Sequence, residues 1–158
     1  MRRFAIFAVM LLVSVTLFAE DAVVGASKDD VTAFVKQAIA FEKANGRDKF
    51  FAEVINPSGL FHFKAGTKKD LYIFVYDEKG VVLAHGARLD LIGKDRWNDK
   101  DPDGKYWIRD WTDLVHKSGS GWLAYKEYNP SANNNIMNKS SYVTLVDAMV
   151  VGCGIYTK

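Results

Sequence analysis

Residues 71–85 read LYIFVYDEKGVVLAH, and this stretch decides the class of fold. Its first part, 71–76, is rich in aromatic and β-branched side chains, which is typical of a buried strand. The polar residues Asp77-Glu78-Lys79-Gly80 then have the composition of a turn, and 81–85 returns to the strand pattern. We therefore predict an antiparallel hairpin.

The register of this hairpin decides which side chains share a face. If the turn closes with Tyr76 opposite Val81, then Tyr72 lies opposite His85. Four side chains then point to the same side of the sheet: Tyr72, Phe74, Leu83 and His85. We expect that face to carry polar tips on an apolar floor.

Helical periodicity precedes the hairpin. Ser27 and Asp30 have the spacing of a capping box, and apolar residues then recur at helical spacing until Asn45-Gly46. A second helical segment is expected over 47–54, and Asn56-Pro57-Ser58-Gly59 ends it in a turn.

The chain after the hairpin adds a helix and three strands. The expected helix is 105–116, and the expected strands are 121–128, 139–146 and 149–156, the last two joined by a tight turn at Asp147-Ala148. Five strands with a long N-terminal helix and a helical crossover predict one α+β domain with an antiparallel sheet.

Composition narrows the classes of function. The chain has 158 residues, with 21 basic and 19 acidic side chains, and it has one cysteine. This near-neutral charge removes the electrostatic case for a nucleic-acid partner or an anionic membrane partner. Cys153 cannot form an intramolecular disulfide, and we expect it to be a buried thiol.

The N-terminus has the three parts of a secretory signal peptide. Arg2 and Arg3 precede an apolar run that ends in the small residue Ala19. We expect cleavage after Ala19, so that 20–158 is a periplasmic or secreted domain with equal numbers of basic and acidic residues. A retained membrane anchor is the alternative. A membrane-spanning helix needs about 20 apolar residues, and this run is shorter.

One motif could bind a cation. The segment 99–104 resembles the start of a calcium loop, with Asp99, Asp101 and Asp103 at alternate positions and Asp110 at the twelfth position. A structural Asp/Gly turn is the favoured interpretation, because the twelfth residue lacks the longer side chain of Glu. No nucleophile and base pair is recognisable, so we expect no enzyme and no cofactor.

The same patterns place several single residues. His62 and His116 are expected on the surface, whereas His85 lies on the inward face of the hairpin. Trp107 and Trp111 repeat at helical spacing and are expected in the core. Periodicity alone favours a surface position for Lys139, with an anion clamp as the alternative.

The order of short motifs resembles the single Cache domain, the extracytoplasmic sensor module of bacterial chemoreceptors and sensor kinases. The resemblance spans roughly residues 30–157. The motifs that carry it include Asn56-Pro57-Ser58-Gly59, Leu71–Asp77, Ala84-His85-Gly86, Asp101–Lys105, Gly119–Trp122, Asn129-Pro130, Lys139–Val143 and Gly152–Tyr156. It implies a PAS-like fold in which a long N-terminal helix lies behind the sheet and the ligand lies on the other face, under a loop and a helix.

The resemblance also implies a ligand site. The lining residues would be Tyr72, His85, Trp97, Tyr125 and Lys139, with Lys139 the first candidate. Members of the family commonly bind short organic acids, and an ammonium with an imidazole and phenolic hydroxyls suits a carboxylate removed from water. The sequence does not orient Arg88, Arg96 and Arg109.

These observations predict an exported, non-enzymatic sensor domain for a small organic acid. The alternative is a structural or protein-interaction module, with or without calcium, whose pocket is filled by its own side chains. Most such domains continue into a membrane helix and a signalling module, whereas this sequence ends at Lys158. We therefore expect a free binder read by a membrane receptor or kinase, or a tethered one, and the question of a homodimer stays open.

Overall fold

The computed structural model describes residues 25–64 and 70–157. Its helices and strands follow one another as α1 (Lys28–Asn45), α2 (Arg47–Ile55), β1 (Phe74–Asp77), β2 (Val82–His85), η1 (Leu89–Leu91), α3 (Trp107–Ser118), β3 (Ser120–Asn129), η2 (Pro130–Ala132), β4 (Asn135–Val146) and β5 (Met149–Thr157). The predicted α+β class is confirmed. The predicted signal peptide, 1–19, and its cleavage site lie outside the described residues.

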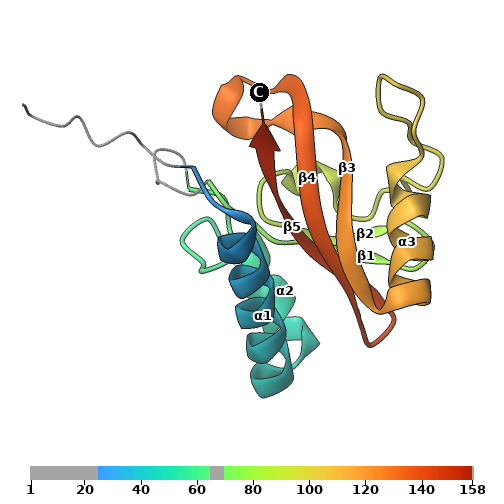
Figure 1. Cartoon of the computed structure of the whole chain (residues 1–158). Helices are drawn as coiled ribbons and strands as arrows, with labels where there is room; N and C mark the ends of the chain where they lie inside the picture. Colours follow the sequence, from blue (N-terminus) through green and yellow to red (C-terminus); the bar gives the residue numbers. More distant parts are fainter. Residues whose placement is uncertain (1–24, 65–69, 158) are drawn as a thin grey trace, which may run out of the picture.

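The strands form one antiparallel sheet in the order β2-β1-β5-β4-β3. Helices α1 and α2 cover one face of this sheet and α3 lies against the other, as Figure 1 shows. This is the PAS-like arrangement that the resemblance implied. Within the described segments, no helix is both long and apolar enough to cross a membrane.

The N-terminal helices begin and end where the sequence predicted. The Ser27 hydroxyl accepts from the Asp30 amide and the Asp30 carboxylate accepts from the Ser27 amide, so the capping box is formed. Gly46 separates α1 from α2 with φ +83°, a conformation that a residue with a Cβ rarely adopts.

The first hairpin forms, but its predicted register is wrong. Phe74 pairs with His85 and Val75 with Ala84, and the pairing then shifts so that Tyr76 lies opposite Val82. Leu83 is the extra residue of this irregularity, and it packs on the α1 side instead of beside Tyr72. His85 keeps the predicted face, because the observed register differs by two residues at that end and side chains alternate with period two.

The C-terminal strands are longer than predicted. Strand β4 begins at Asn135 instead of Lys139. The helix predicted over 105–116 is α3, and it spans Trp107–Ser118. Asp147 and Ala148 form the predicted tight turn, with φ of +45° and +62°. This turn sets the pairing of Lys139 with Tyr156 in the β4–β5 ladder.

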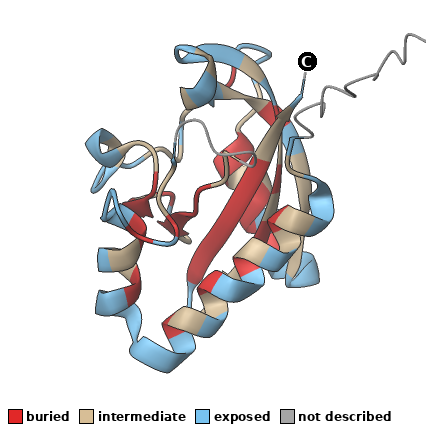
Figure 2. Ribbon diagram, turned by 90° about the vertical axis from the view of Figure 1, so that its left-hand side faces the viewer, coloured by how far each residue is buried: buried red, intermediate tan, exposed pale blue. Residues whose placement is uncertain are grey.

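Each face of the sheet has its own core. Under α1 and α2 the fully buried side chains are aliphatic residues with Phe50, Phe61 and Cys153. Under α3 they are mainly aromatic: Tyr72, Phe74, Tyr76, Trp107, Trp111 and Tyr125. Figure 2 shows buried residues running through the central strands between the two helical layers.

Candidate functional site

A row of polar side chains crosses the α3 face of the sheet. In the ladders, Lys139 on β4 pairs with Tyr125 on β3 and with Tyr156 on β5. Ser141, two residues further along β4, points to the same face and bonds to the Tyr125 hydroxyl at 3.0 Å. The centre of this face therefore carries an ammonium flanked by phenols.

The Lys139 ammonium is buried. The residue is 2% exposed, and its Nζ donates to the Tyr72 hydroxyl at 2.7 Å. Its Nζ also lies 4.7 to 6.0 Å from four aromatic ring centres, those of Tyr72, Phe74, Tyr125 and Tyr156. The surface position that periodicity favoured for Lys139 is wrong, because β4 is an interior strand and aromatic rings cover its α3 face at this residue.

Two glycines of β5 make room for these side chains. A Cβ on Gly152 would lie 2.5 Å from the Phe74 ring, and one on Gly154 would lie 2.9 Å from Cε of Lys139. Both contacts are closer than a real Cβ tolerates, so the Gly-Cys-Gly sequence of this strand lets Phe74 and the lysine stem lie flat across the sheet.

A chain of hydrogen bonds runs from the ammonium of Lys139 to the Tyr128 carbonyl. The Tyr128 carbonyl can only accept, so the Tyr156 hydroxyl, 2.6 Å away, donates to it. The Tyr156 oxygen then accepts from the Tyr72 hydroxyl at 3.0 Å, and Tyr72 accepts from Lys139. Both hydroxyl hydrogens are thereby committed. Burial is the largest cause of the raised pKa of Tyr72.

His85 lies beside this chain as a neutral ring. Its ring centre is 5.2 Å from that of Tyr72, and its Nδ1 accepts from the backbone amides of Ala87 and Arg88. Burial, and then the charge of Lys139, lower the pKa of His85 well below its ordinary value. With Nδ1 accepting, the proton of the neutral ring lies on Nε2.

Tyr125 joins the site to α3. Its ring stacks on Trp107 at 5.8 Å and meets Trp111 edge-on at 5.2 Å. Burial raises the pKa of Tyr125 well above its ordinary value. Both tryptophans are buried, as predicted.

Trp97 lies apart from the other four predicted site residues. Its backbone packs against Gly80 in the hairpin turn, and its ring lies 5.7 Å from the Arg109 guanidinium. The structure therefore brings Tyr72, His85, Tyr125 and Lys139 into contact with one another and places Trp97 beside the hairpin turn, at the margin of the same core.

The three arginines that the sequence could not orient have separate places. Arg96 contacts the Tyr76 hydroxyl, pairs with Asp99 and lies 3.5 Å from Glu127. Arg88 forms a bidentate pair with Asp90 and lies 6.0 Å from the Tyr128 ring. Arg109 donates to the Trp97 carbonyl from α3.

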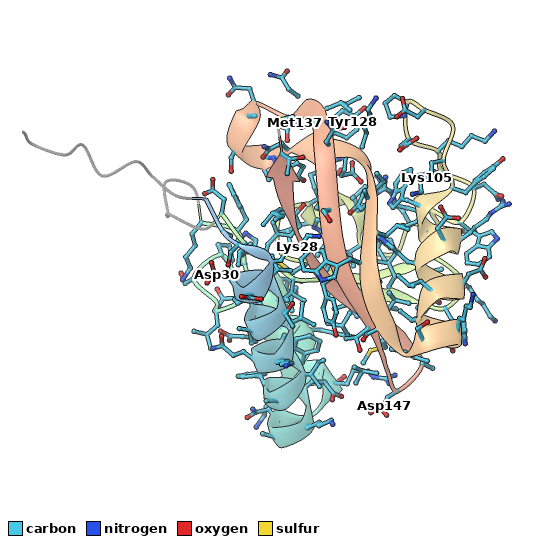
Figure 3. The ribbon with its side chains drawn as sticks, viewed as in Figure 1. Lys28, Asp30, Lys105, Tyr128, Met137 and Asp147 are labelled. Atoms are coloured by element: carbon cyan, nitrogen blue, oxygen red, sulfur yellow. The ribbon has the colours of Figure 1, made fainter. Side chains whose placement is uncertain are left out.

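Two surface hollows include residues of this row or of its neighbours in their lining. One of about 350 Å³ includes Arg96, Trp107, Tyr128 and Ile136 in its lining. The other, of about 280 Å³, includes Tyr125 and Lys139. Figure 3 shows Tyr128 and Met137 near the free end of the β3–β4 hairpin and Lys105 at the start of α3, on the side where these hollows lie.

The acidic loop 99–104 is a structural turn. Asp101 accepts from the amides of Asp103 and Lys105 through Oδ1 and from that of Lys126 through Oδ2. Burial acts to raise the pKa of its carboxyl, but these bonds together outweigh it and the pKa is lowered. The Lys126 ammonium pairs with Asp103 at 2.8 Å. Among the described residues, no group of three or more His, Cys, Asp or Glu side chains could hold a metal ion.

The predictions for the remaining single residues have different outcomes. Cys153 is buried as predicted, and burial raises the pKa of its thiol to about 12. His116 is exposed and pairs with Glu78. His62 is half-buried against the Val54 carbonyl, so its predicted surface position is only partly correct.

Sequence reasoning missed Tyr156, Trp107 and Trp111 as members of the site. Tyr156 could have been found, because counting outward from the two-residue turn at Asp147-Ala148 places it opposite Lys139. Helical spacing revealed that both tryptophans are buried, but it gave no information on the partners of their indole nitrogens.

Comparison with known families gives one match over most of the chain. Residues 27–158 match the family described as Single Cache domain 2. The match includes both helical layers and every strand of the sheet.

Similar solved structures have the same fold. A methyl-accepting chemotaxis protein from Vibrio parahaemolyticus superposes with a TM-score of 0.67 at 26% identity, over 82% of this chain and 87% of that chain. The periplasmic sensor domain of a chemotaxis protein gives 0.63 at 21% identity, over 80% and 88%. A Cache chemosensory domain described for its carboxylic acid recognition gives 0.61 at 24% identity, over 80% and 86%.

Proposed function

The chain belongs to the single Cache domain 2 family, and from this premise we propose that it is an exported, non-enzymatic sensor domain that binds a short organic acid against Lys139. The remaining lining residues in this proposal are Tyr72, His85, Trp97 and Tyr125. Signal peptide cleavage near Ala19 and a membrane receptor or kinase that reads ligand occupancy belong to the same proposal.

The observation that carries the proposal is a buried cation without an anion. Lys139 is 2% exposed, and its hydrogen-bond partner is a neutral hydroxyl. Among the described residues, no carboxylate lies within ion-pair distance of it, and Glu127 is 3.5 Å from Arg96. A buried ammonium is costly unless it is paired, and a ligand carboxylate would supply the missing charge.

The surroundings favour a small ligand with an apolar end. The ammonium lies among aromatic rings, which suit a small apolar group beside a carboxylate. An anion would bind beside neutral donors and a neutral His85 instead of competing with a second carboxylate. The similar Cache domain described for carboxylic acid recognition supports the same class of ligand.

A protein-interaction module without a small ligand is the second candidate. The observation in its favour is that the Tyr72 hydroxyl already occupies one N–H of Lys139. In that case the aromatic core on the α3 face is complete as it stands, and a small acid would find no site.

Thermal shift and calorimetry separate the two candidates. We expect propionate or another short monocarboxylate at 100 times its Kd to raise the unfolding free energy by about 2.7 kcal/mol. Lys139→Met should remove most of that binding, with a loss of about 2–5 kcal/mol of affinity, the usual cost of removing one member of a buried charge pair.

The matched control is Lys117→Met, which removes an exposed lysine on α3 and should leave affinity unchanged. Binding that survives in a folded Lys139→Met protein would contradict the proposed site. If a panel of short carboxylates, amines and sugars produces no thermal shift, the interaction module is the better account.

A further inference from the structure

Two indole nitrogens in the aromatic core of the α3 face have no hydrogen-bond partner. Trp107 and Trp111 are 3% and 2% exposed, and Nε1 of each is buried without an acceptor. Buried tryptophan N–H groups normally find a partner, because an unpaired donor forfeits its hydration with nothing in return. Two such donors on one helix therefore require an explanation.

Both indoles border the rings that surround Lys139. They are four residues apart on α3, so they project from the same side of the helix. Trp107 stacks on Tyr125 at 5.8 Å, and Trp111 stacks on Phe74 at 4.8 Å. The ammonium of Lys139 lies 6.0 Å from the first of these ring partners and 5.3 Å from the second.

The hydroxyl groups of Tyr72 and Tyr156 cannot donate a hydrogen bond to a ligand in this state. The hydroxyl hydrogens of Tyr72 and Tyr156 are both committed along the chain that ends at the Tyr128 carbonyl. The donors that remain are the other N–H groups of Lys139, the Nε2–H of His85, one hydroxyl hydrogen of the Tyr125–Ser141 pair and the two indoles. Within the described residues the ammonium of Lys139 donates one hydrogen bond, to Tyr72, and an ammonium has three N–H groups.

We propose that Trp107 and Trp111 are hydrogen-bond donors to the bound ligand, and that with Lys139 they select a carboxylate that carries no amine. This inference rests on the proposed function and concerns the same site. A carboxylate offers about four lone pairs to such a set of donors. The ammonium of an amino acid would instead lie near Lys139, a like charge, and no carboxylate of the described residues lies within ion-pair distance of Lys139 to offset it.

The four indole N–H signals of the protein give a direct test. They belong to Trp97, Trp107, Trp111 and Trp122, and each can be assigned in a ¹⁵N-labelled sample through its Trp→Phe variant. On titration with propionate we expect the Trp107 and Trp111 signals to move downfield. Trp122 is the internal control, because it packs against Tyr142 on the α1 face.

Calorimetry supplies the second readout. Trp107 or Trp111 replaced by an isosteric benzothienylalanine, which lacks the N–H, should bind propionate about 10- to 100-fold more weakly, the range for a hydrogen bond to a charged group. The same replacement at Trp122 should leave affinity unchanged. Alanine, which is propionate with an added amine, should bind at least about 100-fold more weakly than propionate.

The possible outcomes separate this inference from the proposed function. If propionate binds through Lys139 but the Trp107 and Trp111 signals stay in place and the replacements bind normally, the indoles are not donors and the inference is overturned alone. If alanine binds as tightly as propionate, the selectivity is overturned. If no carboxylate binds, the inference and the proposed function fall together.

Discussion

The two faces of the sheet are built on opposite principles. Under α1 and α2 the buried side chains are apolar apart from Glu42 of α1, and Phe61 contacts the rings of Phe34, Phe41 and Phe50. Under α3 the core contains a buried ammonium, a neutral imidazole and two indole N–H groups without partners. Burial of the apolar side chains on the first face stabilises the fold. On the second face, burial of polar groups without partners lowers the stability of the fold.

This difference indicates how one small domain divides its tasks. An apolar face stabilises the fold whatever the ligand state, so the opposite face can tolerate unpaired polar groups that a ligand would satisfy. The strands are shared, and β5 places Cys153 in the α1 core between two glycines that make room on the α3 face. Substitutions on the two faces should therefore have separable effects on stability and affinity.

The largest effect on stability is expected on the α1 face. Phe61→Ala removes a fully buried ring and should lower the unfolding free energy by about 3–5 kcal/mol in urea denaturation. Propionate affinity of the folded fraction should not change. A cost below about 1 kcal/mol would contradict the assignment of the main stabilising core to this face.

A substitution at the glycine beside Lys139 should change both quantities. In Gly154→Ala the new Cβ would lie 2.8 Å from the Ser140 carbonyl and 2.9 Å from Cε of Lys139, and would also collide with the Ser141 hydroxyl. We expect a loss of about 1–3 kcal/mol in stability together with weaker propionate binding. Gly25→Ala is the control, because nothing lies within 4 Å of its added Cβ. An unchanged Kd in Gly154→Ala would show that the lysine stem need not lie across β5.

The α3 face should also make stability depend on pH. The pKa of His85 is lowered in the folded state by burial and by Lys139, Arg96 and Arg88, while Asp90 acts in the opposite direction. The unfolded chain, with a histidine pKa of about 6.5, then binds more protons than the folded chain. The contribution of His85 to stability is therefore complete above pH of about 6.5 and is lost as the pH falls toward the folded pKa.

Urea denaturation of the wild type and His85→Gln between pH 5 and 8 measures this dependence. The wild type should lose more stability than the variant on acidification, and replacement of the exposed His116 by Gln should leave the wild-type dependence in place. Parallel curves for the wild type and His85→Gln would show that the ring is not a buried neutral group.

The smallest effect is expected where neither face is involved. Ala148 has φ +62° in the β4–β5 turn, a region that costs an L-residue about 1–2 kcal/mol. Ala148→Gly should therefore stabilise the domain by about 1 kcal/mol, measured as a higher midpoint in urea, with no change in propionate affinity. A destabilised Ala148→Gly protein would contradict the conformation of this turn.

The elements that the sequence predicted well depend on local patterns. The capping box, the helical periodicity of α1 and α3 and the turn at Asp147-Ala148 are each set by residues close together in the chain. The hairpin pattern predicted that Tyr72 and His85 share a face, and the family resemblance added Tyr125 to the same cluster. Its geometry agrees with that expectation, while their role in binding remains a prediction.

The strand registers, the burial of Lys139 and the arginine orientations depended on contacts that local patterns do not encode. The β1–β2 register shifts at an irregularity, so a simple count from the turn fails for Leu83. Lys139 reads as a surface residue until Tyr125 and Tyr156 are placed on either side of it, and the β3–β4 register follows a connection that contains η2. The arginine orientations likewise required the tertiary partners, such as Tyr76 for Arg96.

The central claim is that the buried ammonium of Lys139 receives a ligand carboxylate. A crystal structure of the protein with propionate tests it most directly. We predict a carboxylate oxygen about 2.7–2.9 Å from Nζ of Lys139, between α3 and the sheet. Propionate found only in the hollow beside Arg96, with Lys139 still bonded to Tyr72 alone, would contradict the claim.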